Sequence, residues 1–363
     1  MRIGYDVRML AGSDRPSGIG RYALSLISAM RQFGIVELFS DRPWSVPPEL
    51  SDLRLNVLPP TPSWQQSRLP FALRTRHIDV FHGLSFTIPI WAPCKTVVTI
   101  HDLGYVRATS TVAPDVRRYL SHLAPQAIAK SSAIIVPSEA VREDLSRAYP
   151  RHARKARVVP HGVDNMFLQH DHTESQEEIR QTLGEDRPYI LAVGTHEPRK
   201  NLARLVEAFR ELADVLPHRL IVVGAANNET HIIRDKVEPD LGSRVRLLGY
   251  LPNHELVRYY KGADAFVYPS LFEGFGLPLL EAMASGCPIA TSERPCMPEV
   301  AGEAAVYFNP LNRSDMRDQI HRLLTHPELR EDLRQKGFLR VQGYTWEATA
   351  SRTYHAYEEA LRA

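Results

Sequence analysis

Short apolar runs alternate with longer segments of helical periodicity along almost the whole chain. Several of the runs are continuously apolar, which is typical of parallel strands covered on both faces. We predict strands at residues 2–7, 36–40, 54–58, 78–83, 95–102, 133–138, 156–162, 189–194, 219–224, 244–249, 265–270, 288–292 and 305–309. Helical patterns lie between them, as at 20–34, 201–216, 254–263 and 277–286. This alternation predicts βαβ units and an α/β fold.

The alternation pauses once, at the polar residues 167–188. A chain of 363 residues is long enough for two domains. We therefore predict two Rossmann-like domains with parallel sheets facing a central cleft, at residues 1–166 and 167–344. The last helical pattern, 345–363, could pack on either domain. We expect it to pack on the first.

The composition, 44% hydrophobic and 24% charged, is typical of a soluble globular protein. No run of 18 apolar residues exists, and the N-terminal residues have no apolar core of a signal peptide. The three cysteines show no C-x-x-C spacing, which favours a reducing compartment. We expect a cytoplasmic protein.

Charge is distributed unevenly. Residues 1–165 carry 21 lysines and arginines against 13 acidic residues, whereas the remainder carries 23 against 29. A basic half suits a phosphate-bearing partner or an anionic membrane, but it also suits an ordinary solvated surface. The basic residues are scattered and lack interleaved aromatics, so we expect no nucleic-acid partner.

Open α/β sheets bind ligands at the carboxyl ends of their strands. Arg199 and Lys200 follow the strand 189–194 and precede a helix, which favours an anion site over a solvated charge pair. His101 follows the strand at 95–100, where a buried structural histidine is the alternative. Gly18 opens a helix with Ser17 as its N-cap, where an ordinary helix start is the alternative.

The stretch YPSLFEGFGLPLLEAMASGCPIATS, residues 268–292, places Glu273 and Glu281 on either side of a glycine-bearing turn. Pro278 indicates the first turn of a helix that ends at Gly286, so we expect Glu281 in that first turn. The backbone N–H groups of about 275–277 would then be available to an anion. A carboxylate that complements the helix dipole is the alternative for Glu281.

A sugar nucleotide would use all of these features, because it carries both a diphosphate and neutral hydroxyls. The residues also resemble a known family. EGFGLPLLEAMASGCPIATS resembles the E-x7-E signature of the family 4 retaining glycosyltransferases, which have the two-domain GT-B fold. PSGIGRY, TIHDL, VPHGVD, GTHEPRKN and PEVAGEAAVYFNP are similar to that family in the same order. The combination most resembles bacterial mannosyltransferases of O-antigen and exopolysaccharide synthesis.

The resemblance implies roles for the matching positions. Glu281 would hold the ribose hydroxyls of the donor, and Glu273 would bind the transferred sugar. The backbone of Gly274, Phe275, Gly276 and Leu277 would face the sugar and the diphosphate.

The resemblance also implies which groups stabilise the leaving group. Arg199 and Lys200 would stabilise the departing diphosphate, and His101 would contact a donor-sugar hydroxyl. Gly18 would let the acceptor-side loop close on the phosphate. Many relatives carry arginine where this chain has Thr195, which places more of the charge stabilisation on Arg199 and Lys200.

The expected reaction is transfer of a hexose, mannose from GDP-mannose, with retention of configuration, to a saccharide or lipid-linked saccharide acceptor in surface polysaccharide synthesis. UDP-, ADP- and dTDP-sugars are alternative donors. We expect no cofactor and no essential metal. Segments 67–77 and 115–125 mix cations with apolar residues, so they suit peripheral contact with an anionic membrane or amphipathic helices that cover the sheet.

Three other functions stay open. A sugar-nucleotide epimerase would need no acceptor, and a phosphorylase would need a lysine that carries pyridoxal phosphate. A non-catalytic sugar-nucleotide-binding scaffold subunit would bind donor without turnover.

Overall fold

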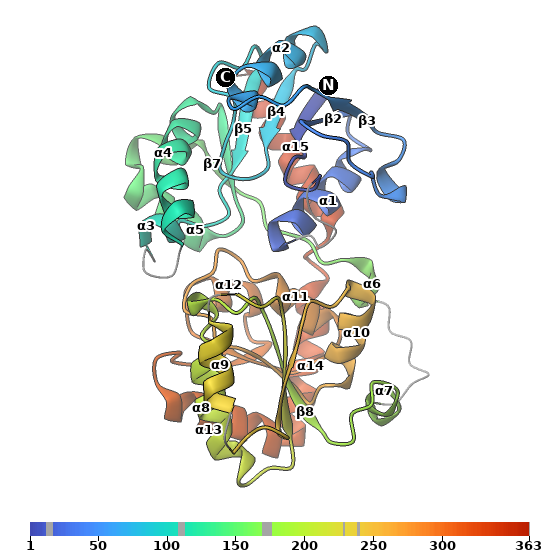
Figure 1. The fold of residues 1–363 in the computed structure, drawn as a ribbon, viewed down its shortest axis with the longest axis vertical. Helices are drawn as coiled ribbons and strands as arrows, with labels where there is room; N and C mark the ends of the chain where they lie inside the picture. Colours follow the sequence, from blue (N-terminus) through green and yellow to red (C-terminus); the bar gives the residue numbers. More distant parts are fainter. Residues whose placement is uncertain (12–16, 108–112, 169–175, 228, 238–239, 363) are drawn as a thin grey trace. The chain divides into compact units, whose positions relative to one another are not determined.

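The computed structural model describes residues 1–11, 17–107, 113–168, 176–227, 229–237 and 240–362. The chain divides into two compact units (Figure 1). Unit 1 comprises Met1–Gly162 and Thr345–Ala363, and unit 2 comprises Val163–Tyr344. The predicted boundary after residue 166 lies close to the observed one, and part of the predicted connecting region, 169–175, lies outside the described residues.

Unit 1 is built on a seven-stranded parallel sheet of order β3-β2-β1-β4-β5-β6-β7. Its continuous apolar strands are buried on both faces, as the pattern predicts. The strands are β1 (Arg2–Asp6), β2 (Ile35–Ser40), β3 (Arg54–Val57), β4 (Val80–Gly83), β5 (Lys95–Thr99), β6 (Ala133–Val136) and β7 (Ala156–Val158).

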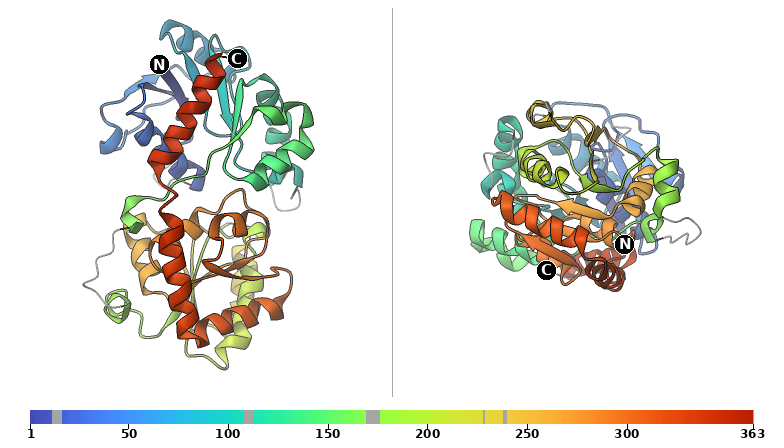
Figure 2. Two further views of the ribbon diagram at one scale, coloured as in Figure 1. Left: turned by 180° about the vertical axis from the view of Figure 1, so that it is seen from behind. Right: turned by 90° about the horizontal axis from the view of Figure 1, so that it is seen from below.

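Helices cover both faces of this sheet. The core residues of α2, α4 and α5 pack on one face, and α1 and α15 pack on each other across the opposite face (Figure 2). The helices are α1 (Gly18–Met30), α2 (Arg68–Thr75), α3 (Gly104–Arg107), α4 (Pro114–Lys130), α5 (Glu139–Ala148) and α15 (Trp346–Arg362), with short 3₁₀ turns η1 (Pro48–Leu50), η2 (Trp64–Gln66) and η4 (Pro150–Lys155).

Unit 2 is built on a six-stranded parallel sheet of order β10-β9-β8-β11-β12-β13. The strands are β8 (Tyr189–Val193), β9 (Arg219–Val223), β10 (Val245–Leu248), β11 (Ala265–Tyr268), β12 (Ile289–Ser292) and β13 (Ala305–Phe308). Every strand predicted from the sequence is present, and the two parallel sheets confirm the predicted fold class.

The helices of unit 2 pack around this sheet, and α8, α9 and α13 share one hydrophobic core with it. The helices are α6 (Asn165–Leu168), α7 (Gln176–Thr182), α8 (Leu202–Ala213), α9 (Thr230–Val237), α10 (Asn253–Gly262), α11 (Leu277–Ala284), α12 (Cys296–Ala301), α13 (Arg313–Thr325) and α14 (Pro327–Val341), with the 3₁₀ turn η5 (Pro198–Lys200). In the described part of the chain, no helix is both long and apolar enough to span a membrane.

A buried hydrogen-bond network joins the C-terminal helix α15 to the sheet of unit 1. The Tyr357 hydroxyl lies 3.0 Å from the Tyr5 hydroxyl and 2.6 Å from Nδ1 of His82. Nε2 of His82 lies 2.8 Å from the Thr99 hydroxyl, which also bonds to Tyr22 at 2.9 Å. The network satisfies polar groups that would be costly to bury unpaired, and it fixes α15 on unit 1.

The two sheets share one topological feature. In each sheet, the first three strands along the chain are added toward one edge, and the later strands are added toward the opposite edge. The switch point is the place between the two neighbouring strands where this direction reverses. It lies between β1 and β4 in unit 1 and between β8 and β11 in unit 2. Ligands of open α/β sheets bind beyond the carboxyl ends of the strands at such a point.

Candidate functional site

The loops after β8 and β11 meet at the switch point of unit 2. The backbone N–H of Leu271, after β11, donates to the carbonyl of Arg199, after β8, at 2.8 Å. This contact brings together two segments that the sequence places some seventy residues apart. The predicted residues Arg199, Lys200 and Glu273 are therefore neighbours.

Two cations converge on one carboxylate at this point. Nζ of Lys200 donates to Oε1 of Glu273 at 2.5 Å, and Nη1 of Arg199 donates to Oε2 at 2.7 Å. The Lys200 and Glu273 side chains are only 10% and 9% exposed. Burial lowers the pKa of Lys200, although Glu273 opposes this effect. Burial acts to raise the pKa of Glu273, but the two cations outweigh it and lower that pKa to about 2.

Two glycines shape the backbone that carries Lys200. A Cβ on Gly194 would lie 3.2 Å from Cδ of Lys200, so the absence of a side chain lets the lysine stem pack against the end of β8. A Cβ on Gly224 would lie 1.9 Å from the carbonyl oxygen of Gly194. Glycine after both strands thus permits a close approach that no other residue allows.

A left-handed asparagine turns the chain from η5 into α8. Asn201 has φ 58° and is the N-cap residue of α8. Its side-chain amide donates to the carbonyls of Pro269 at 3.1 Å and Pro310 at 2.8 Å, both from other loops. Pro198 occupies the first position of η5. The turn therefore fixes the direction of the two preceding cations.

The glycine turn before α11 is present, but one prediction about it is wrong. Gly276 has φ 99°, a conformation that a side chain would strain, and α11 begins directly after it at Leu277. Pro278 lies in the first turn, as expected, whereas Glu281 is the fifth residue and lies in the second turn. The predicted start at residue 277 is confirmed, but a turn of about 3.6 residues ends before the fifth residue of that helix. Gly286, with φ 69°, follows the C-cap Ser285.

Glu281 is a buried carboxylate held by a tyrosine. It is 4% exposed, and its Oε2 accepts a hydrogen bond from the Tyr260 hydroxyl at 3.0 Å. Tyr260 lies on α10 and is fully buried. The second turn of α11 and the face of α10 thus orient this carboxylate together.

The sequence interpretation missed three other polar residues of this site. The Tyr268 hydroxyl accepts from Nζ of Lys200 at 2.9 Å, and Oε2 of Glu197 accepts from Nε of Arg199 at 2.9 Å. His196, beside Glu197, lies 3.0 Å through Nδ1 from the Thr230 hydroxyl. Tyr268 ends β11, and Glu197 and His196 lie in the GTHEPRKN motif. Their positions after strands β11 and β8 could therefore have indicated that they belong to the site.

Two further predicted residues, His101 and Gly18, belong to unit 1. His101 is buried, and its Nε2 lies 2.8 Å from the carbonyl of Leu84, which can only accept. Burial lowers the pKa of His101 to about 4, so the ring is neutral near pH 7 with its proton on Nε2. Gly18 is the first residue of α1, whose N-cap Ser17 accepts from Gly20 N–H at 3.2 Å. The first residue of the quoted motif PSGIGRY, Pro16, lies outside the described residues.

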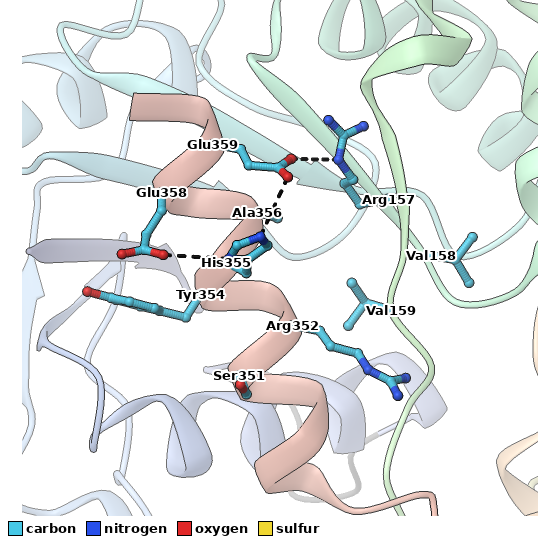
Figure 3. Close-up of a pocket in the computed structure, with 10 residues that line it drawn as sticks. All are labelled: Arg157, Val158, Val159, Ser351, Arg352, Tyr354, His355, Ala356, Glu358 and Glu359. Carbon is cyan, nitrogen blue, oxygen red and sulfur yellow. Dashed lines mark hydrogen bonds and ion pairs between the residues drawn. The ribbon is translucent and has the colours of Figure 1, made fainter. Parts of the chain in front are cut away.

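A cavity of about 460 Å³ lies between β7 and α15 in unit 1. Figure 3 shows its lining, where Arg157 donates to Glu359 at 2.6 Å and His355 lies beside Glu358 and Glu359. None of its lining residues is one that the sequence predicts for the site. Among the described residues, no group of three or more His, Cys, Asp or Glu side chains is arranged to hold a metal ion.

Comparison with protein families gives two adjoining matches. The model "Glycosyltransferase Family 4" matches residues 16–166, and the model "Glycosyl transferases group 1" matches residues 175–340. Together they cover every strand of the two sheets except β1.

Curated relatives include mannosyltransferases of enteric bacteria. The chain is 28% identical to O-antigen chain mannosyltransferase B of Escherichia coli over 296 residues, 80% of this chain and 77% of that protein. It is 26% identical to O-antigen chain mannosyltransferase RfbU of Salmonella typhimurium, over 67% of this chain and 64% of that protein. It is 27% identical to serotype-specific mannosyltransferase WbdA of Escherichia coli, of which it spans only 36%.

Solved structures share the fold at lower identity. Sucrose-phosphate synthase from Thermosynechococcus elongatus has a TM-score of 0.79 at 23% identity, covering 99% of this chain and 98% of that one. Anabaena HepE in complex with UDP and glucose has a TM-score of 0.79 at 18% identity, covering 98% of each chain.

Proposed function

Because this chain belongs to the family 4 glycosyltransferases, a family of retaining hexosyltransferases with the GT-B fold, we propose that it transfers mannose from GDP-mannose to a saccharide or lipid-linked saccharide acceptor in surface polysaccharide synthesis. The observation that carries the proposal is the convergence of Arg199 and Lys200 at the switch point of unit 2. That position suits the diphosphate of a sugar nucleotide.

The charges of the site support a leaving-group role for the two cations. Glu273 accepts from both cations in the structure, so a donor diphosphate competes with this carboxylate for the same N–H groups. An ammonium has three N–H donors, and Tyr268 and Glu273 accept two of those of Lys200. The third can stabilise the charge that develops on the departing phosphate.

Retention does not require a protein nucleophile in this proposal. The departing phosphate oxygen takes the proton of the acceptor hydroxyl on the same face of the sugar, and Arg199 and Lys200 stabilise that oxygen. Glu273 accepts hydrogen bonds from hydroxyls of the transferred hexose. The chain then contributes positioning and electrostatic stabilisation.

The other site residues hold the donor. Glu281 accepts from the ribose hydroxyls while Tyr260 fixes its orientation. The backbone from Gly274 to Leu277 leads into α11 and faces the diphosphate, since a helix start favours anions. His101, neutral with its proton on Nε2, accepts a sugar hydroxyl at Nδ1. Gly18, where an added Cβ would meet nothing within 4 Å, lets the backbone at the start of α1 approach the phosphate.

The choice of GDP-mannose follows the names of the curated relatives, which are mannosyltransferases. The HepE complex with UDP and glucose supports a UDP-sugar as the alternative donor. A thermal-shift panel of GDP-, UDP-, ADP- and dTDP-sugars tests the choice, and we expect the largest shift with GDP-mannose. A larger shift with another donor would reassign the nucleotide.

Turnover separates an enzyme from a scaffold subunit. We expect mannose transfer to a mannoside acceptor with the α configuration retained, measured by NMR of the product. Nucleotide binding without any turnover would support the non-catalytic alternative, and change of the sugar without an acceptor would support an epimerase.

We further propose that unit 1 contacts an anionic membrane that carries the acceptor. Val116 and Tyr119 on α4 are 45% and 53% exposed beside the exposed Arg117 and Arg118. The other end of α4 places Nζ of Lys130 5.5 Å from the ring centroid of Trp91, which is 76% exposed. Exposed aromatics next to cations suit a lipid interface.

Co-sedimentation with vesicles tests this contact. We expect binding to vesicles with 30% phosphatidylglycerol, about thirtyfold weaker when Arg117 and Arg118 are both replaced by glutamine, since each cation near an anionic surface contributes about 1 kcal/mol and two contribute about 2 kcal/mol. Absence of binding at low salt would exclude the contact.

A further inference from the structure

A second group of polar side chains lies at the switch point of unit 1. Asp6 ends β1, and Thr87 lies in the loop after β4, the strand beside β1 across the switch point. Arg8 follows Asp6, and Gln65 belongs to η2, which follows β3. All four residues follow the carboxyl ends of parallel strands. We call Asp6, Arg8, Gln65 and Thr87 the Asp6 cluster.

Hydrogen bonds connect the members of this cluster. Arg8 and Asp6 form a bidentate ion pair, with Nε to Oδ1 at 3.0 Å and Nη2 to Oδ2 at 2.7 Å. The amide of Gln65 donates to the Thr87 hydroxyl at 3.0 Å and lies 3.4 Å from Oδ2 of Asp6. The geometry joins three loops from both sides of the switch point.

Packing holds the cluster in place while part of it faces solvent. The Arg8 guanidinium lies 4.3 Å from the ring centroid of Trp64, which is 2% exposed. The Asp6 and Arg8 side chains keep 12% and 29% exposure. A planar guanidinium between an aromatic ring and a carboxylate loses little further freedom when a ligand binds.

The loop that carries Thr87 is also held rigidly. A Cβ on Gly83 would lie 2.1 Å from the carbonyl oxygen of Thr87, so the loop folds back tightly onto the end of β4. Phe86 adopts φ 58°, which is strained for a bulky residue. Its backbone N–H donates to the backbone carbonyl of Thr99 at 3.0 Å. The Gln66 side chain holds the same loop by donating to Ile88 and accepting from Ile90 N–H.

The chemistry of the cluster indicates which class of ligand it suits. Asp6 and Arg8 cancel one another's charge, and Gln65 and Thr87 are neutral, so the cluster offers no net attraction to a phosphate. It offers a carboxylate that accepts, a guanidinium that donates, and an amide and a hydroxyl that do both. Such mixed donors and acceptors match the neighbouring hydroxyls of a saccharide ring.

We propose that the Asp6 cluster is the subsite that binds the hydroxyl groups of the acceptor saccharide. The inference rests on the proposed function, because it assigns the acceptor of that transfer to unit 1. Asp6 accepts from the ring hydroxyls, and Arg8 and Gln65 donate to their oxygens. The cluster is a binding group and takes no part in bond breaking.

Ligand-observed NMR with methyl α-glycosides of mannose, glucose and galactose tests the proposal on the full chain. We expect at least one glycoside to bind, and Asp6→Asn or Arg8→Lys to weaken that binding about tenfold, the usual effect of losing a charged hydrogen bond. Asp52→Asn is the matched control, because it removes an exposed ion-pair carboxylate from the same unit. Asp52→Asn should leave the glycoside affinity unchanged.

GDP binding, measured on the same samples by calorimetry, separates the two proposals. We expect GDP affinity within twofold of the wild type in every variant. Unchanged glycoside affinity in both cluster variants, or no glycoside binding by the wild type, would overturn the subsite. If the wild-type protein does not bind GDP, the proposed function is contradicted instead. If both variants fail to fold, Thr87→Val deletes one hydroxyl, and an unaltered glycoside affinity would then be the contrary result.

Discussion

The two units have the same architecture but bury different kinds of titratable group near their switch points. Unit 1 buries three neutral histidines, His82, His101 and His161, whereas unit 2 buries the ion pair of Lys200 and Glu273. Burial lowers the pKa of His82 to about 3 and of His101 to about 4, and it lowers the pKa of His161 well below 6.5. The pKa of Glu273 is lowered to about 2.

This difference separates a polar core from an ionic site. A neutral imidazole can hydrogen-bond to hydroxyls without the cost of burying a charge, which suits the unit that we propose binds the acceptor. A buried ion pair is costly to form but keeps cations ready for an anionic ligand, which suits a diphosphate site. The two units should therefore respond differently to acid and to mutation.

Acid should produce the largest effect, and it should act first on unit 1. A histidine with a lowered pKa stabilises the fold above the unfolded value of about 6.5 and loses that contribution as pH falls toward the folded value. His82 and His101 each cost about 2 kcal/mol between pH 7 and pH 5, and His161 adds a loss in the same direction. Among the described residues of unit 2, burial lowers the pKa of one histidine, His196, and Glu273 contributes stability that is lost only below about pH 4.5.

Tryptophan fluorescence can measure this separately, because all four tryptophans, Trp44, Trp64, Trp91 and Trp346, belong to unit 1. Fluorescence follows the unfolding of unit 1, whereas circular dichroism follows both units. From pH 7 to pH 5, we expect the urea midpoint of unit 1 to fall more steeply than the midpoint of the other transition, which circular dichroism assigns to unit 2. His82→Gln should remove about 2 kcal/mol of that dependence, and the exposed His355→Gln should leave it unchanged. Equal acid sensitivity of the two transitions would contradict the comparison.

Lys200→Ala should produce the second largest effect. Removing a preorganised donor to a developing charge costs about 10²–10³ in kcat, or about 3–4 kcal/mol. We expect this loss with a smaller change in the donor KM, measured with GDP-mannose and a mannoside acceptor. Lys336→Ala is the control, since that lysine pairs with Asp332 on the surface of α14. A kcat equal to that of the wild type would remove Lys200 from the mechanism.

The sequence was sufficient to predict the strands and the edges where polar residues gather. Parallel strands buried on both faces leave continuous apolar runs, and their carboxyl ends give the residues that follow them a common location. That is why Arg199, Lys200 and Glu273 could be assigned to one site before their contacts were known.

Contacts between distant segments could not be predicted in the same way. No local pattern indicates that Tyr260 on α10 holds Glu281, or that Tyr357 near the C-terminus bonds to His82. Glu281 was assigned to the wrong turn although the helix start at residue 277 was correct, because a turn of about 3.6 residues ends before the fifth residue.

Glu273→Gln tests how the ionic site of unit 2 is balanced. The variant removes the carboxylate that Lys200 and Arg199 share and leaves Arg199 paired with Glu197, so a diphosphate meets less competition for their N–H groups. We expect GDP to bind about three- to tenfold more tightly, or about 1 kcal/mol, while transfer to the acceptor falls because the hexose loses a partner. Calorimetry measures the gain in GDP affinity. The surface variant Glu331→Gln should bind GDP with the affinity of the wild type. Weaker GDP binding would show that Glu273 does not oppose the diphosphate.

Tyr260→Phe should have the smallest effect, because it changes only the orientation of a carboxylate. The variant keeps the buried ring and deletes the hydroxyl that donates to Glu281, so the carboxylate loses one fixed direction. We expect about 1 kcal/mol, a threefold to fivefold loss of GDP affinity, with little change in kcat once donor saturates. Tyr259→Phe is the matched control, because it deletes a hydroxyl from the preceding residue of the same helix. If both variants bind GDP equally well, the orientation of Glu281 does not depend on Tyr260, and the ribose contact is set by α11 alone.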